Sequence, residues 1–154
     1  MLVGVVDDGV EYTHSEFQGA YRTDIDEDYG GGDSDAAPGS GDSHGTAVAG
    51  LIGARNDGVG TVGVAFGSGL TGYRIFGGTV TDSEYRDVYR HHSDGVDIFS
   101  NSWGYNGVFC DDFDGNNFAA AGLGINEAVA QGRDGLGSVI LFAAGNDRQA
   151  RKWY

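Results

Sequence analysis

The sequence predicts an α/β fold in which a parallel β-sheet lies between two layers of helices. Short apolar segments rich in β-branched residues alternate along the chain with segments of helical pattern. Strands separated by helices form right-handed crossovers, which produce a parallel sheet covered on both faces. With 154 residues, 40% of them hydrophobic, the chain is long enough to bury one core and is interpreted as a single domain.

Four strands and three helices are expected. The strands are predicted at residues 2–6, 70–76, 96–102 and 138–144, and the helices at residues 44–54, 81–92 and 118–131. The second helix opens with Thr81-Asp82-Ser83-Glu84, the pattern of a capping box. Residues 24–43 are acidic and glycine-rich, and residues 105–117 are polar and acidic, so we expect a loop and an insertion there.

The net charge and the sequence at the N-terminus exclude several classes of function and partner. A net charge of −14 argues against nucleic acid and anionic membranes as partners. This negative charge fits three properties: Ca²⁺ sites, a preference for basic substrates, or solubility in a salty medium. No apolar run approaches the ~18 residues of a membrane span. Met1 leads directly into a strand, without a signal peptide, and Cys110 is the only cysteine. An exported protein would therefore need a leader that this chain lacks.

Polar motifs follow three of the predicted strands. Asp7-Asp8-Gly9 follows the first, Asn101-Ser102-Trp103-Gly104 the third, and Gly145-Asn146 the fourth. The carboxyl ends of parallel strands meet at one edge of the sheet, where ligands bind in such folds. We therefore expect these motifs to lie along one edge.

Asp7 and His44 are candidates for acid–base chemistry. A carboxylate at a strand end can hold the Nδ1–H of a histidine, and a catalytic base needs its other nitrogen facing a nucleophile. The alternatives for Asp7 and Asp8 are a solvated turn or a Mg²⁺-binding pair, as in phospho-receiver domains. His14, His91 and His92 are interpreted as ordinary surface or core residues.

The two later motifs suit peptide binding and oxyanion stabilisation. An extended backbone at residues 102–104 could pair with a bound peptide by strand addition. The amide of Asn146 is a suitable donor to an oxyanion. The alternative for Asn146 is turn chemistry, because Gly-Asn-Asp is turn-prone.

In their order and context these motifs resemble the subtilisin-like serine proteases, and within them the kexin/proprotein-convertase branch. The segment His44-Gly45-Thr46-Ala47-Val48-Ala49-Gly50 is the most specific part, with support from Asp7-Asp8 and residues 132–138. The resemblance implies a subtilisin-like fold and a serine endopeptidase, with an extracellular or otherwise exported parent. It makes Asp7 the orienting acid, His44 the general base and Asn146 the oxyanion amide, and it places Ser102, Trp103 and Gly104 along the specificity pocket.

The convertase branch also implies substrate preferences. Asp8 and a carboxylate just before the histidine, here Asp42, would favour a basic residue at the second substrate position. Asp42 lies one residue closer to His44 than in those relatives. The acidic pocket wall of convertases is replaced after Gly104 by Tyr105-Asn106-Gly107-Val108, with Asp111, Asp112 and Asp114 nearby but displaced.

A structural Ca²⁺ site is a further implication of the resemblance. Its pattern falls on the carboxylates of Glu16 and Asp57 and on the backbone oxygens of Arg55, Val59 and Thr61. Carboxylates and carbonyls are the hard oxygen ligands that Ca²⁺ prefers. The alternative is a plain surface turn at Asn56-Asp57-Gly58.

The family's Gly-Thr-Ser nucleophile segment does not occur in residues 1–154. We therefore expect the N-terminal part of a peptidase domain, unable to hydrolyse peptides alone. One rival is a non-catalytic relative that kept the peptide groove. The other is the phospho-receiver, which leaves His44-Gly45-Thr46 unexplained.

Overall fold

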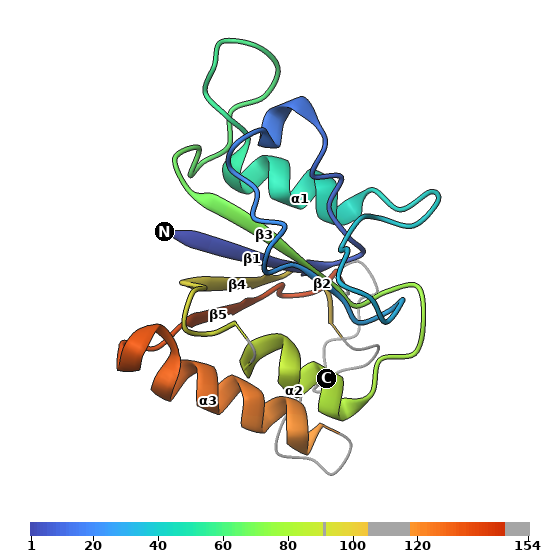
Figure 1. Cartoon of the computed structure of the whole chain (residues 1–154), viewed down its shortest axis with the longest axis vertical. Coiled ribbons are helices and arrows are strands. Elements are labelled where there is room, and N and C mark those ends of the chain that lie inside the picture. Colours follow the sequence, from blue (N-terminus) through green and yellow to red (C-terminus); the bar gives the residue numbers. More distant parts are fainter. Residues whose placement is uncertain (91, 105–117, 147–154) are drawn as a thin grey trace.

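The computed structural model describes residues 1–90, 92–104 and 118–146. Its five strands are all parallel and lie in the order β2-β3-β1-β4-β5 (Figure 1). Their bounds are β1 Leu2–Asp7, β2 Glu27–Asp28, β3 Gly69–Arg74, β4 Ile98–Asn101 and β5 Val139–Phe142. The predicted parallel sheet is confirmed.

Helices cover both faces of this sheet. Helix α1 (His44–Gly53) lies on one face, while α2 (Asp82–Arg90) and α3 (Ala119–Gly135) pack against each other on the other face (Figure 1). A short 3₁₀ helix, η1 (Ser15–Phe17), lies near α1. The three-layer prediction is therefore confirmed. No helix in the described part of the chain is both long and apolar enough to cross a membrane.

The central strand β1 is buried along its whole length, which explains its uninterrupted apolar sequence. Val3 and Val5 pack in the cluster beneath α1. Val6 faces the opposite side, in the cluster that contains Tyr73 and Phe99 and is covered by α2 and α3. Because both faces are buried, β1 holds the residue at its carboxyl end in a fixed place.

The parallel register aligns the carboxyl ends of the central strands. Asp7 is paired with Arg74 of β3, and Val6 with Asn101 of β4. Asn101 is itself buried, where its amide accepts from the Tyr89 hydroxyl at 2.9 Å and donates to the Leu141 carbonyl at 3.0 Å. Asn101 therefore stabilises the edge of the sheet at which Asp7 also lies.

The structure corrects several predicted boundaries. The segment 24–43 is not wholly a loop, because Glu27 and Asp28 pair with β3 as the edge strand β2. The strands predicted at 70–76, 96–102 and 138–144 are each shorter at the carboxyl end, and α2 ends at Arg90 instead of residue 92. Helix α3 continues past residue 131 to Gly135, with a kink at residues 132–134.

The predicted capping box is confirmed. The Thr81 amide donates to Glu84 Oε2 at 2.6 Å, and the Glu84 amide donates to Thr81 Oγ1 at 3.3 Å. The predicted insertion at 105–117, which includes Cys110, Asp111, Asp112 and Asp114, lies outside the described residues, as does His91.

Candidate active site

Asp7 ends the buried strand β1, and its side chain is 2% exposed. Its Oδ1 accepts a hydrogen bond from the Asp8 amide at 2.8 Å and lies 2.8 Å from Nδ1 of His44. Its Oδ2 is buried and has no hydrogen-bond partner in the described part of the chain. The predicted pairing of Asp7 with His44, 37 positions apart in the sequence, is therefore present in the structure.

His44 is the first residue of α1, and its side chain is 60% exposed. With Asp7 as the acceptor, Nδ1 carries the hydrogen and donates it, which leaves Nε2 as the nitrogen that can exchange a proton. The buried end of the pair is thus the orienting carboxylate, and the exposed end is the imidazole.

Asp7 and His44 influence each other's pKa. Burial raises the pKa of the Asp7 carboxyl, and the hydrogen bond with His44 opposes that rise. The hydrogen bond with Asp7, with a contribution from its charge, raises the pKa of His44. An imidazole with a raised pKa is a stronger base, as proton transfer from a hydroxyl requires.

Asp8 fixes the start of α1. Its carboxylate accepts from the backbone amides of His44 at 3.0 Å and Gly45 at 2.6 Å. The first residue before the helix, Ser43, makes no such bond with its own side chain. Asp8 therefore caps the helix from a neighbouring strand, a role that the sequence analysis did not assign to it.

A glycine at position 45 allows the close approach of β1 and α1. A Cβ on Gly45 would lie 2.8 Å from Cβ of Asp7 and would also collide with the carbonyl oxygen of Gly9. Any larger residue would push the first turn of α1, and with it His44, away from Asp7. This explains in physical terms why His44 is followed by glycine.

Asp42 lies near the pair, but it faces a cation that the sequence analysis missed. Its Oδ2 is 3.7 Å from Nη2 of Arg74, whose Nη1 is 2.6 Å from Oδ2 of Asp28. Asp8 and Asp42 are both at the carboxyl edge, yet neither carboxylate is unengaged. Their predicted contact with a basic substrate residue stays a prediction.

The other predicted binding residues follow β4 and β5 at the same edge. Ser102 and Trp103 are half-buried and Gly104 is exposed. The Trp103 ring packs against Tyr85 and Phe142, with ring centroids 5.6 Å and 5.5 Å apart. Asn146 is exposed beyond the end of β5. The fold thus gathers these residues along one edge, while their roles in binding and catalysis stay predictions.

The predicted Ca²⁺ ligands come together only in part. Glu16 of η1 faces the loop after α1, where its Oε1 accepts from the Thr61 amide at 3.2 Å and its backbone carbonyl accepts from the Arg55 amide at 3.1 Å. Gly60 has a positive φ of 68°, and a Cβ there would collide with the Glu16 carboxylate. The Asp57 carboxylate instead accepts from the Val59 amide at 3.1 Å.

In the described ranges, no three acidic, histidine or cysteine side chains form a cluster that could hold a metal ion. The carboxylates of Glu16 and Asp57 each accept from a backbone amide of the loop, and the predicted Ca²⁺ site stays a prediction.

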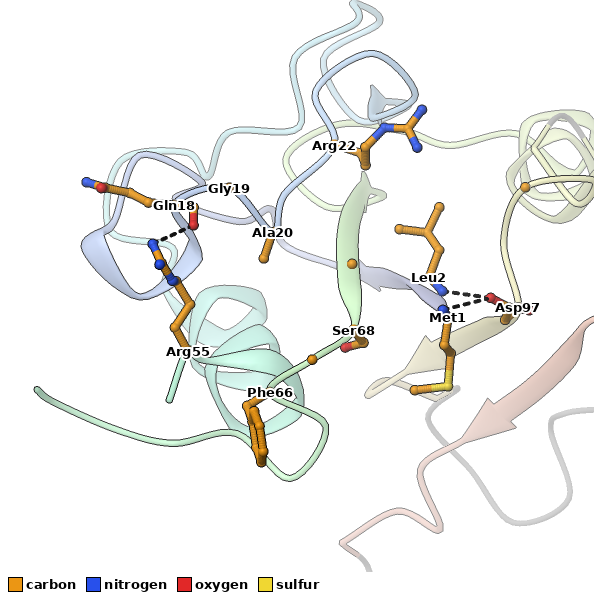
Figure 2. Close-up of a pocket in the computed structure, with 13 residues that line it drawn as sticks. Met1, Leu2, Gln18, Gly19, Ala20, Arg22, Arg55, Phe66, Ser68 and Asp97 are labelled. Carbon is orange, nitrogen blue, oxygen red and sulfur yellow. Dashed lines mark hydrogen bonds and ion pairs between the residues drawn. The ribbon is translucent and has the colours of Figure 1, made fainter. Parts of the chain in front are cut away.

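A pocket of about 660 Å³ lies at the opposite edge of the sheet (Figure 2). It is lined by residues at the amino end of β1 and β3, among them Leu2 and Ser68, and Leu2 is roughly 17 Å from Asp7 along β1. Its polar groups are bound within the fold: Leu2 donates its amide to Asp97 at 2.7 Å, and Arg55 donates to the Gln18 carbonyl at 2.7 Å. The Asp7–His44 pair is therefore not part of this pocket.

The chain belongs to the subtilase family, whose family model matches residues 1–153. It is 35% identical over 158 residues to the proprotein convertase subtilisin/kexin type 7 of Mus musculus, covering 97% of this chain and 20% of that protein. It is 33% identical over 155 residues to furin of Homo sapiens, covering 95% of this chain and 19% of furin. A calcium-dependent protease of Trichormus variabilis is 32% identical over 156 residues, covering 97% of this chain and 23% of that protein.

Solved structures share the fold. The serine protease of Aeromonas sobria superposes with a TM-score of 0.79 at 24% identity, covering 95% of this chain and 25% of that one. The nisin leader peptidase of Lactococcus lactis gives a TM-score of 0.68 at 26% identity, covering 96% of this chain and 44% of that one. The chain spans about a fifth of the length of the curated relatives it matches. Membership of this family makes the phospho-receiver interpretation wrong.

Proposed function

We propose that this chain carries the acid–base half of a serine endopeptidase of the subtilisin/kexin type. The observation that carries the proposal is the 2.8 Å contact between buried Asp7 and exposed His44, which orients the imidazole through Nδ1 and leaves Nε2 for proton transfer. The names of the relatives, which are proteases and proprotein convertases, support the same reaction class.

In the proposed reaction, Nε2 of His44 removes the proton from a serine hydroxyl as the serine oxygen attacks the carbonyl carbon of the peptide bond. The negative charge that develops on the carbonyl oxygen is stabilised by the side-chain amide of Asn146. The protonated imidazole, held by Asp7, then gives its proton to the leaving amine. Water then attacks the acyl-enzyme, with His44 taking a proton from the water and returning it to the serine oxygen, and the peptide acid is released.

The nucleophile belongs to a Gly-Thr-Ser segment that residues 1–154 do not contain. We therefore propose that the parent protein supplies it, and that residues 1–154 alone neither hydrolyse peptides nor form an acyl-enzyme. Catalysis by the residues of a triad depends on all of its members, because the base has no proton to remove without the hydroxyl.

The substrate proposal is a peptide segment bound in extended form beside residues 102–104, with a preference for a basic residue at the second position. Strand addition to the backbone gives affinity, and Asp8 and Asp42 would give the preference through their charge. Export of the parent follows from the same family relationship and stays a prediction.

We also propose a structural Ca²⁺ site. Glu16, Asp57 and the backbone oxygens of Arg55, Val59 and Thr61 would hold the ion between η1 and the loop after α1. The ion would contribute stability and would take no part in proton transfer. The position of the Glu16 carboxylate against Gly60 and Thr61 supports the site, as does the name of the calcium-dependent relative.

A serine-directed fluorophosphonate tests the reaction class. The parent protein, expressed from its complete reading frame, is expected to be labelled on the serine of its Gly-Thr-Ser segment, and His44→Ala is expected to abolish the labelling. His14→Ala is a matched control, because His14 is an exposed histidine whose Nδ1 accepts from the nearby Glu16 amide and which lies outside the Asp7–His44 pair. Labelling of residues 1–154 alone would show that one of their own serines is a nucleophile.

The alternative is a non-catalytic relative that binds peptides. Such a relative would keep the peptide-binding edge at residues 102–104 and would have no Gly-Thr-Ser nucleophile segment anywhere in its complete reading frame. A complete reading frame without such a segment, together with peptide binding and no labelling, would establish this alternative. A reading frame with the segment would establish the peptidase.

A further inference from the structure

Arg74 lies at the carboxyl end of β3, directly beside Asp7 in the parallel register. Its side chain is only 13% exposed, which is unusual for arginine. No motif in the sequence predicts a role for this residue. A guanidinium withdrawn from water needs several polar partners, and those of Arg74 come from three segments around the Asp7–His44 pair.

Each nitrogen of the guanidinium faces a different segment. Nη1 is 2.6 Å from Oδ2 of Asp28 in β2, Nε donates to the backbone carbonyl of Asp8 at 3.3 Å, and Nη2 is 3.7 Å from Oδ2 of Asp42. Two glycines make room for the group, since a Cβ on Gly77 would collide with Nη2 and a Cβ on Gly39 would lie 2.8 Å from it. The surroundings of Arg74 are therefore shaped to fit a guanidinium.

Two of these three contacts are with residues that hold or closely precede His44. The backbone carbonyl of Asp8 accepts a hydrogen bond from Arg74, while its carboxylate accepts hydrogen bonds from the amides of His44 and Gly45. Asp42 stands two residues before His44 in the segment that enters α1. A guanidinium that holds both residues fixes the start of α1 relative to the end of β1.

We propose that Arg74 is a positioning residue that holds the His44 imidazole on the Asp7 carboxylate. The group is bound to Asp8 and Asp42 on the side of the helix, and to Asp28 on the side of the sheet. Only a planar group with several donors can serve all three partners at once, so lysine would be an incomplete substitute. This inference rests on the proposed function, because it assigns Arg74 to the orientation of the proposed base.

A positioning role of Arg74 and a purely electrostatic one predict opposite changes in the pKa of His44 when Arg74 is replaced. Asp7 and Asp8 are the carboxylates that face His44, and Arg74 is the cation paired with Asp28 and Asp42 beside them. If Arg74 acted only as a positive charge, its removal would raise the pKa of His44, because repulsion of the imidazolium would end. If Arg74 positions His44, its removal loosens the bond to Asp7 and the pKa of His44 falls.

The experiment is an NMR titration of the His44 ring in residues 1–154 and three variants. Arg74→Lys keeps the charge, and Arg74→Gln removes it. Arg74→Gln combined with Asp28→Asn removes both charges of the buried pair, so that the fold is not destabilised by a buried carboxylate without its partner. Arg22→Gln is the control, because it removes an arginine that pairs with Asp24 at the surface.

The proposal predicts that the pKa of His44 falls in all three Arg74 variants, least in Arg74→Lys, and does not change in Arg22→Gln. An unchanged or higher pKa in the folded variants would overturn it. Failure of all three variants to fold, judged by circular dichroism, would also overturn it, because Arg74 would then be needed for folding as a whole. If His44 of the unsubstituted chain does not titrate above its ordinary value, the proposed Asp7–His44 function fails instead.

Discussion

Asp8 connects the two secondary-structure elements on which the candidate site depends. It follows Asp7 at the end of β1, and its carboxylate accepts the first two amides of α1. A carboxylate at this position satisfies amides that have no partner within the helix and interacts favourably with the helix dipole. The residue that follows the proposed acid thus holds the proposed base in place.

Replacing Asp8 by alanine should lower the free energy of unfolding by about 1 kcal/mol, the usual cost of losing a helix cap. The measurement is urea denaturation followed by circular dichroism. Asp94→Ala is the matched control, since Asp94 is exposed in the turn before β4. Equal stability of the two variants would contradict the capping role.

His44 should make the stability of the chain depend on pH. Because Asp7 raises the pKa of His44 in the folded state, the stabilisation is fully present below the unfolded-state pKa of about 6.5 and is lost as pH rises through the folded-state pKa. The difference in Tm between the unsubstituted chain and His44→Ala should therefore be larger at pH 6 than at pH 9. In an Asp7→Asn background, the same substitution should show no such trend.

At the scale of elements, η1 and the loop after α1 are in contact at the place where we propose the Ca²⁺ site. Glu16 connects the two through its carboxylate and its backbone carbonyl, and the Arg55 side chain adds a bond to the carbonyl of Gln18, the residue after η1. The loop contains glycines with positive φ at positions 58 and 60, so its conformation can adjust around an ion. A cation bound there would replace the single hydrogen bond from Thr61 with several oxygen contacts.

Millimolar Ca²⁺ should therefore raise the Tm, because a ligand that binds only the folded state stabilises it by mass action. Glu16→Ala should remove most of the increase, whereas Glu11→Ala, which removes an exposed glutamate outside the loop, should keep it. Differential scanning fluorimetry with Ca²⁺ and with a chelator measures the effect. Identical melting curves in the two conditions would assign Glu16 and Asp57 to an ordinary surface turn.

At the scale of the whole molecule, the parallel sheet could be predicted because β1 is apolar and buried on both faces and because apolar segments alternate with helical ones along the chain. The edge strand β2 could not, since Glu27 and Asp28 show no apolar pattern and form a strand only through pairing with β3. The Asp7–His44 pair was predictable from specific motifs. The contacts that Asp8 and Arg74 make with His44, Asp8 and Asp42 were not, because they join residues 32 to 66 positions apart and depend on the folded register.

Asp7 and His44 should form an oriented pair in solution, and the measurement that decides this is an NMR titration of the His44 ring in the unsubstituted chain and in Asp7→Asn. Asparagine keeps the shape of the side chain and removes its charge. His44 is expected to titrate above its ordinary value in the unsubstituted chain and at a lower pH in Asp7→Asn. The same midpoint in both proteins would show that the carboxylate exerts no influence on the imidazole, and the pair would then not exist in solution.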